Sequence, residues 1–205
     1  MQALLIVDAQ NEFSPRGLRA VPDHAGALAR INELVDQARQ RLLPIAWVQH
    51  HNQPHESPAF VPGSWGAELS PGLGPLSGFG PERLFQKDVF GAFTRTELET
   101  WLRGLEVKSV LIAGFYTHMC FSTSAREALV RGFDVSVDPA ATRATALEDA
   151  LLGRLSADEV RRSALLHLRH MGVTIEPGVA PTLAGQGAAS PGNQRRSDKV
   201  VRPIC

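Results

Sequence analysis

The sequence predicts an α/β protein, a three-layer α/β/α sandwich built on a mostly parallel six-stranded sheet. Short apolar runs at residues 3–7 (ALLIV) and 107–113 (VKSVLIA) have the composition of strands buried on both faces. Segments with apolar residues at three- and four-residue steps lie between such runs, as in amphipathic helices. Strands that alternate with helices form parallel units with right-handed crossovers, which assemble into this Rossmann-like architecture.

The elements follow in order along the chain. The predicted strands are residues 3–7, 44–49, 83–87, 107–113, 133–137 and 173–175. The predicted helices are residues 23–41, 94–103, 119–131 and 157–171. Thr94 with Glu97 has the spacing of a capping box, and Gly104 and Gly132 are placed to end the helices before them. Residues 50–81 are rich in Pro, Gly and Ser, and long connections of this kind are often functional.

Length and composition limit the function classes. The 205 residues fit one domain, which we place at residues 1–180, with residues 181–205 predicted to be a disordered tail. Basic and acidic residues number 21 each, so we expect no nucleic-acid partner, and no apolar run could span a membrane. Cys120 and Cys205 cannot form a disulfide framework, and the N-terminus resembles a strand more than a signal peptide. We therefore expect a cytoplasmic protein.

Three reactive residue types follow predicted strands. Asp8 ends the first strand, Lys87 ends the third, and Cys120 comes just after the strand at residues 107–113, where a helix is predicted to start. Carboxyl ends of parallel strands meet at one edge of the sheet, where ligands bind. A helix N-terminus and a lysine would both lower the pKa of a thiol, which favours a nucleophile. Taken singly, each residue has an ordinary interpretation: a buried apolar cysteine, a loop-capping aspartate and a surface lysine.

Three motifs contain these residues: LLIVDAQNEF at residues 4–13, FQKDVFGAFTRTEL at residues 85–98 and LIAGFYTHMCFSTSAREA at residues 111–128. With these motifs the chain resembles the isochorismatase-like cysteine hydrolases, the superfamily that also includes nicotinamidases and N-carbamoylsarcosine amidohydrolase. The resemblance covers residues 2–177. It implies the isochorismatase-like fold and a catalytic triad of Asp8, Lys87 and Cys120.

The resemblance also implies details of the site. A cis peptide bond is expected at Phe115–Tyr116, which would direct the amides of Tyr116 and Cys120 toward an oxyanion. The family motifs include Gln10, Phe13 and Phe93, which we place in the substrate pocket, although Phe13 and Phe93 could equally be core residues. We also place Tyr116 and His118 near the substrate. Trp65 could close over a substrate or lie at a subunit contact.

We expect no cofactor and no metal. Three histidines, His50, His51 and His55, lie in a short segment and are the alternative for a metal site. The aspartate that accompanies such histidines in nicotinamidases is missing here. That difference also weakens a nicotinamidase assignment.

The sequence predicts hydrolysis of a C–N bond in a small amide, imide or ureide through a covalent intermediate on Cys120. One alternative is a non-catalytic or redox-sensing binding protein on the same fold. Another is the vinyl-ether cleavage of isochorismatase itself, although family members with that activity can lack the cysteine. The expected partners are a small-molecule substrate and other copies of the chain, as a homodimer or homotetramer.

Overall fold

The structure, a computed structural model, describes residues 1–175. The predicted tail at residues 181–205 and the last residues of the predicted domain 1–180 lie outside the described residues. The central sheet contains six strands in the order β3-β2-β1-β4-β5-β8, and every pair of neighbours is parallel. The strands are β1 (Gln2–Val7), β2 (Ile45–His50), β3 (Glu82–Lys87), β4 (Ser109–Phe115), β5 (Asp134–Arg143) and β8 (Thr174–Ile175). The predicted α/β class is confirmed.

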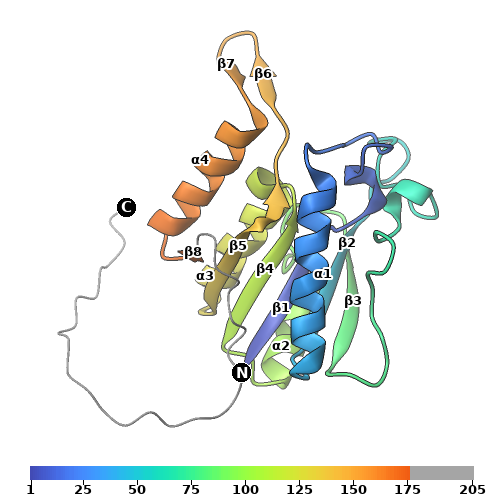
Figure 1. Cartoon of the computed structure of the whole chain (residues 1–205), viewed down its shortest axis with the longest axis vertical. Helices are drawn as coiled ribbons and strands as arrows, with labels where there is room; N and C mark the ends of the chain where they lie inside the picture. The colour runs from blue at the N-terminus through green and yellow to red at the C-terminus, as the bar shows by residue number, and fades with distance from the viewer. Residues whose placement is uncertain (176–205) are drawn as a thin grey trace, which may run out of the picture.

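Helices cover both faces of the sheet, so that its central strands are buried on both sides (Figure 1). The helices are α1 (His24–Gln40), α2 (Leu98–Gly104), α3 (Ser122–Val130) and α4 (Ala157–His170). In β1, Leu4 and Ile6 pack with apolar residues of α1, whereas Leu5 and Val7 point to the opposite face. Period-two alternation along a strand therefore builds two separate cores.

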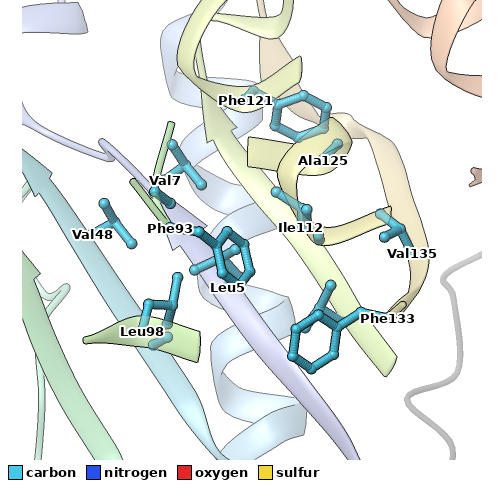
Figure 2. Packing of buried hydrophobic residues seen from close by; sticks show 14 of the residues in the cluster. Leu5, Val7, Val48, Phe93, Leu98, Ile112, Phe121, Ala125, Phe133 and Val135 are labelled. Carbon is cyan, nitrogen blue, oxygen red and sulfur yellow. The ribbon is translucent and has the colours of Figure 1, made fainter. Parts of the chain in front are cut away.

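The second core lies between the sheet and helices α2, α3 and α4. Figure 2 shows Leu5 of β1 and Ile112 of β4 packing against Phe93 and Phe133, with Ala125 of α3 nearby. Fully burying a side chain such as Leu5 stabilises the fold by roughly 1.5–3 kcal/mol. This packing holds the strand ends, and the residues after them, in fixed positions.

Three local predictions were wrong. Helix α2 begins at Leu98 and not at Thr94, because the Thr94 side chain hydrogen-bonds to Glu127 of α3 instead of capping a helix. The helix predicted to begin at residue 119 begins at Ser122, after an irregular turn at Thr117–Phe121. Strand β5 runs on to Arg143, well past the predicted end.

A hairpin of β6 (Leu147–Asp149) and β7 (Gly153–Leu155) was not predicted. It projects beyond the sheet at the top of Figure 1, and all six strand residues are exposed. With no buried face, it has no alternation of apolar and polar residues to reveal it. Among residues 1–175, no helix is long and apolar enough to cross a membrane.

Candidate active site

Asp8 follows β1 in a left-handed backbone conformation, with φ 53°, and is fully buried. Its N–H donates to the carbonyl of Val48 in β2 (2.9 Å). The adjacent strand comes close at this point: a Cβ on Gly114 would lie 1.8 Å from the carbonyl oxygen of Val7. Glycine is therefore required there, and Asp8 is held by both neighbouring strands. Such backbone strain is often found at functional sites.

Lys87 is the last residue of β3, and its side chain is completely buried. Its ammonium donates to Asp8 Oδ2 (2.7 Å), His50 Nδ1 (3.1 Å) and the carbonyl of Val89 (3.1 Å). Burial alone would lower the pKa of Lys87, but Asp8 and then Cys120 raise it above its usual value. The three protons of the ammonium thus have three acceptors, and Lys87 stays charged.

The His50 ring is neutral and held in one tautomer. The Asn52 amide donates to the carbonyl of Ala59 (3.1 Å), so its oxygen accepts from His50 Nε2 (2.8 Å). Nδ1 is then the unprotonated nitrogen that accepts from Lys87. Burial, and after it the Lys87 ammonium, lowers the pKa of His50. A chain of hydrogen bonds runs from Asn52 through His50 and Lys87 to Asp8.

Gln10 holds the backbone of His50. Its amide oxygen accepts from the His50 N–H (2.9 Å), and its nitrogen donates to the carbonyls of His50 (2.9 Å) and Ala67 (2.7 Å). Gln10 is fully buried and does not line the cavity described below. It was predicted to lie in the substrate pocket, and its side chain is instead occupied by these three bonds.

Cys120 faces Asp8 and His50. One Asp8 oxygen, one His50 ring nitrogen and Cys120 Sγ all lie within 4.8 Å of one another. Asp8 Oδ1 is buried, and no hydrogen-bond partner for it is found in the described part of the chain. The structure thus brings the three predicted catalytic residues together, with one carboxylate oxygen held by Lys87 and the other unpaired.

The predicted lowering of the Cys120 pKa is not observed. Burial raises the pKa of the thiol, the Asp8 carboxylate raises it further, and the Lys87 ammonium opposes the rise without overcoming it. Cys120 is only 8% exposed, so the loss of hydration outweighs the effect of the Lys87 ammonium. The resting form of Cys120 is therefore a neutral thiol.

The predicted cis bond at Phe115–Tyr116 is also absent, since the peptide bonds of residues 1–175 contain no cis form. The chain changes direction by other means. Gly114 adopts φ 121°, and Met119 takes a non-helical conformation (φ −119°, ψ −107°) between the two halves of the turn. These two residues absorb the backbone change that brings Cys120 to the sheet edge.

A cavity of about 260 Å³ opens above Cys120. Its walls are largely aromatic, formed by Phe13, Phe60, Phe90 and Tyr116. The other lining residues are polar or contain sulfur: Asp8, Arg19, His50, Asn52, Met119 and Cys120. The volume fits a small molecule whose apolar part lies among the rings.

Of the pocket residues predicted from the sequence, Phe13 and Tyr116 line this cavity, but Trp65, Phe93 and His118 do not. Trp65 is 41% exposed and has the Arg16 guanidinium 4.7 Å from its ring centroid. Phe93 packs in the core against Phe133, with ring centroids 5.9 Å apart. His118 stacks on Tyr116 and lines a separate depression beside α4.

The structure does not bring together the three histidines considered as the alternative metal site. His51 lines a surface depression with Arg95, and His55 is exposed. Asp8, His50 and Cys120 do place potential ligand atoms close together. The Lys87 ammonium, however, already donates to Asp8 and His50, and burial leaves Cys120 as a neutral thiol. A metal would have to displace that cation, so this donor set does not fit one.

Sequence reasoning missed the role of His50. A signal was present, because His50 directly follows the predicted strand at residues 44–49. In the structure it ends β2 and is paired with Lys87 in the β2–β3 register. No comparable signal marked Arg19, Asn52 or Phe60. They reach the cavity from long loops whose path depends on contacts distant in the sequence.

A family model described as the isochorismatase domain matches residues 2–175. The chain belongs to the isochorismatase family. It is a hydrolase of that family, as the resemblance of its motifs predicted.

Relatives and solved structures agree with this assignment. Nicotinamidase 3 of Arabidopsis thaliana is 31% identical over 185 residues, covering 80% of this chain and 88% of the relative. Streptothricin hydrolase of Streptomyces noursei is 32% identical over 135 residues, covering 66% and 51%. The crystal structure of an isochorismatase from Pseudomonas putida KT2440 superposes with a TM-score of 0.78 at 27% identity, covering 86% of this chain and 87% of that one.

Proposed function

We propose that this protein is a cysteine hydrolase that cleaves the C–N bond of a small amide, imide or ureide. The observation that carries the proposal is that the two carboxylate oxygens of Asp8 have different surroundings. Its Oδ2 is held by Lys87, while its Oδ1 is unpaired in the described structure and Cys120 Sγ lies nearby. An amidase and a streptothricin hydrolase among the relatives support a C–N bond as the target.

The first half-reaction forms an acyl-enzyme. Cys120 Sγ attacks the carbonyl carbon while Asp8 Oδ1 takes the thiol proton, so no free thiolate accumulates. The backbone N–H groups of Tyr116 and Cys120 remain the donors expected for the oxyanion, although the cis bond expected to direct them is absent. The tetrahedral intermediate collapses, the C–N bond breaks, and Asp8 returns the proton to the leaving nitrogen. The product that departs is ammonia or an amine, and a thioester remains on Cys120.

The second half-reaction is hydrolysis. Asp8 removes a proton from a water molecule that attacks the thioester, and Cys120 leaves and regains the proton. The acid is released. Lys87 holds Asp8 in place throughout, because the ammonium donates to Oδ2 (2.7 Å). The neutral His50 keeps the ammonium directed at the carboxylate.

The redox-sensing alternative makes a different prediction: oxidants modify Cys120 and no amide is hydrolysed. No observation in the cavity favours vinyl-ether cleavage. The small-molecule partner, the homodimer or homotetramer and the cytoplasmic location remain predictions. Mass measurement in solution tests the assembly.

The test begins with a Cys205→Ser protein, so that Cys120 is the one thiol in the chain. Iodoacetamide at pH 7.5 should add one label at Cys120, measured by intact mass, and Asp8→Asn should slow it at least tenfold. Ammonia release from a panel of aromatic and aliphatic amides should then stop in the labelled protein. An unreactive Cys120, or hydrolysis that survives labelling, would overturn the proposal.

A further inference from the structure

The charged residues that line the cavity do not cancel one another. Asp8 is neutralised by Lys87, and the pKa of His50 is lowered by burial, so its ring is uncharged. Arg19 is the remaining charged lining residue. No carboxylate of residues 1–175 lies within ion-pair distance of its guanidinium. The cavity therefore presents an uncompensated positive charge.

The backbone of Arg19 is fixed even though its side chain is exposed. The Arg19 N–H donates to the carbonyl of Glu12 (3.1 Å), and the Arg19 carbonyl accepts from the Tyr116 hydroxyl (2.7 Å). The Tyr116 ring is itself held between Phe13 and His118, with centroids 4.8 Å and 5.3 Å away. A rigid aromatic support therefore sets where the Arg19 side chain begins.

The charged residues Glu12 and Arg16 of the same loop form no ion pair with the Arg19 guanidinium. Glu12 is 4% exposed, does not line the cavity, and accepts at Oε1 from the N–H of Leu18 (3.1 Å). Arg16 packs over Trp65, outside the cavity. The charge of Arg19 acts on Tyr116: burial raises the pKa of that phenol to about 12, and Arg19 opposes the rise.

We propose that Arg19 is the residue that selects the substrate, by binding a carboxylate on the part of the molecule away from the scissile bond. The inference rests on the proposed amide hydrolysis and narrows its substrate class. The substrate is a small amide with an aromatic or apolar body and an acidic group. Arginine suits this role because its planar fork pairs with a carboxylate through two hydrogen bonds.

The first measurement compares two alkylating reagents that differ in one group. 4-(Iodoacetamido)benzoate carries a carboxylate at the far end of its ring and iodoacetanilide carries none, and both alkylate Cys120 in the Cys205→Ser protein. Each rate, followed by intact mass, is divided by the rate with glutathione. We expect Arg19→Gln to lower the ratio of the benzoate reagent's rate to the anilide reagent's rate about threefold to fivefold, the effect of losing one ion pair that is open to solvent. Arg16→Gln is the matched control and should leave the ratio unchanged.

The second measurement does not depend on thiol reactivity. Benzoate and nitrobenzene have nearly the same shape, only benzoate is charged, and neither contains a C–N bond to a carbonyl that the protein could cleave. Benzoate should raise the melting temperature of the protein more than nitrobenzene does, and Arg19→Gln should remove the difference. Arg16→Gln should retain it.

The outcomes separate the two proposals. One outcome is that the ratio of the two alkylation rates is the same before and after Arg19→Gln, and that the protein has no preference for benzoate over its neutral counterpart. This would overturn the role of Arg19 and leave the hydrolase mechanism intact. A benzoate preference that disappears in Arg19→Gln, together with a Cys120 inert to both reagents, would support the carboxylate site and overturn the hydrolase mechanism.

Discussion

Two hollows of the molecule differ in how their charged groups are used. The larger, of about 610 Å³, lies between the first residues of α1 and α4 and is lined by Arg143 and Arg161. Arg143 donates to Asp23 (2.5 Å), and Arg161 donates to Asp158 (3.2 Å) and a backbone carbonyl. The smaller, of about 260 Å³ above Cys120, has an unpaired guanidinium and an unpaired carboxylate oxygen within the described residues.

The comparison teaches that volume does not identify the reactive site. In the larger hollow, the protein already satisfies its own arginines, so a ligand would have to replace existing bonds. In the cavity above Cys120, Asp8 Oδ1 is buried without a partner in the described residues, which is costly, and the exposed Arg19 guanidinium has no ion-pair partner there either. A buried, unpaired carboxylate oxygen close to a thiol therefore marks the reactive site better than volume does.

The largest difference between the two hollows should appear in catalysis. Asp8→Asn removes the proton acceptor for Cys120, and we expect kcat/KM for an amide substrate to fall by about 10²–10⁴-fold. Asp158→Asn, in the larger hollow, should leave kcat/KM within twofold, or about 0.4 kcal/mol in activation free energy. Equal losses in the two variants would contradict the assignment.

The buried ion pair should dominate stability. Lys87→Met leaves the Asp8 carboxylate buried without its cation, and the free energy of unfolding should fall by about 3–5 kcal/mol. Urea denaturation measures the loss. Adding Asp8→Leu removes the stranded charge, so the double variant should be more stable than Lys87→Met alone. A double variant with the sum of both single losses would show that the charges are not coupled.

Loss of the Gln10 hydrogen bonds to the backbone of His50 should have an intermediate effect. Gln10→Ala leaves the His50 N–H and two carbonyls without their partner, at a cost of about 1–3 kcal/mol in unfolding free energy. Because Gln10 lies outside the cavity, kcat should fall while KM changes little. Gln49→Ala is a suitable control, since its side chain also donates to Ala67 (2.7 Å) but does not bond to His50. A rise in KM alone would contradict the positioning role.

Stability should decrease below neutral pH. Burial lowers the pKa of His24, His50 and His118. The unfolded chain binds protons at its ordinary histidine pKa of about 6.5, before the folded protein does. The free energy of unfolding is therefore highest above that pH and falls as the pH drops through 6.5 toward the folded values.

Urea titrations at pH 7.5, 6.5 and 5.5 measure this slope. His24 stacks on Phe115 and has a buried Nε2 with no partner in residues 1–175. We expect His24→Phe to flatten the slope, and His170→Gln, at an exposed position, to leave it unchanged. A slope that is the same in all three proteins would show that buried His24 does not contribute.

The smallest effect should come from the larger hollow. Arg161 is partly exposed and bonds to exposed groups, so Arg161→Gln should change the unfolding free energy by no more than about 0.5 kcal/mol. The alkylation rate of Cys120 should not change. A slower rate would link this hollow to the site and weaken the contrast between them.

The sequence by itself determined the parallel α/β architecture and the residues that follow its strands. Apolar runs and helical periodicity are local properties, and parallel strands must place their carboxyl ends at one edge. Asp8, Lys87 and Cys120 could therefore be named without coordinates. The hairpin at residues 147–155 could not, because a segment that buries nothing leaves no periodic pattern.

The tertiary structure decided the chemistry of those residues. The pairing of His50 with Lys87 depends on the β2–β3 register, and the cavity wall depends on loops that carry Arg19 and Phe60. The raised pKa of Cys120 depends on how completely the fold removes water from the thiol. Burial and long-range contacts are properties of the packed chain, so no local pattern in the sequence records them.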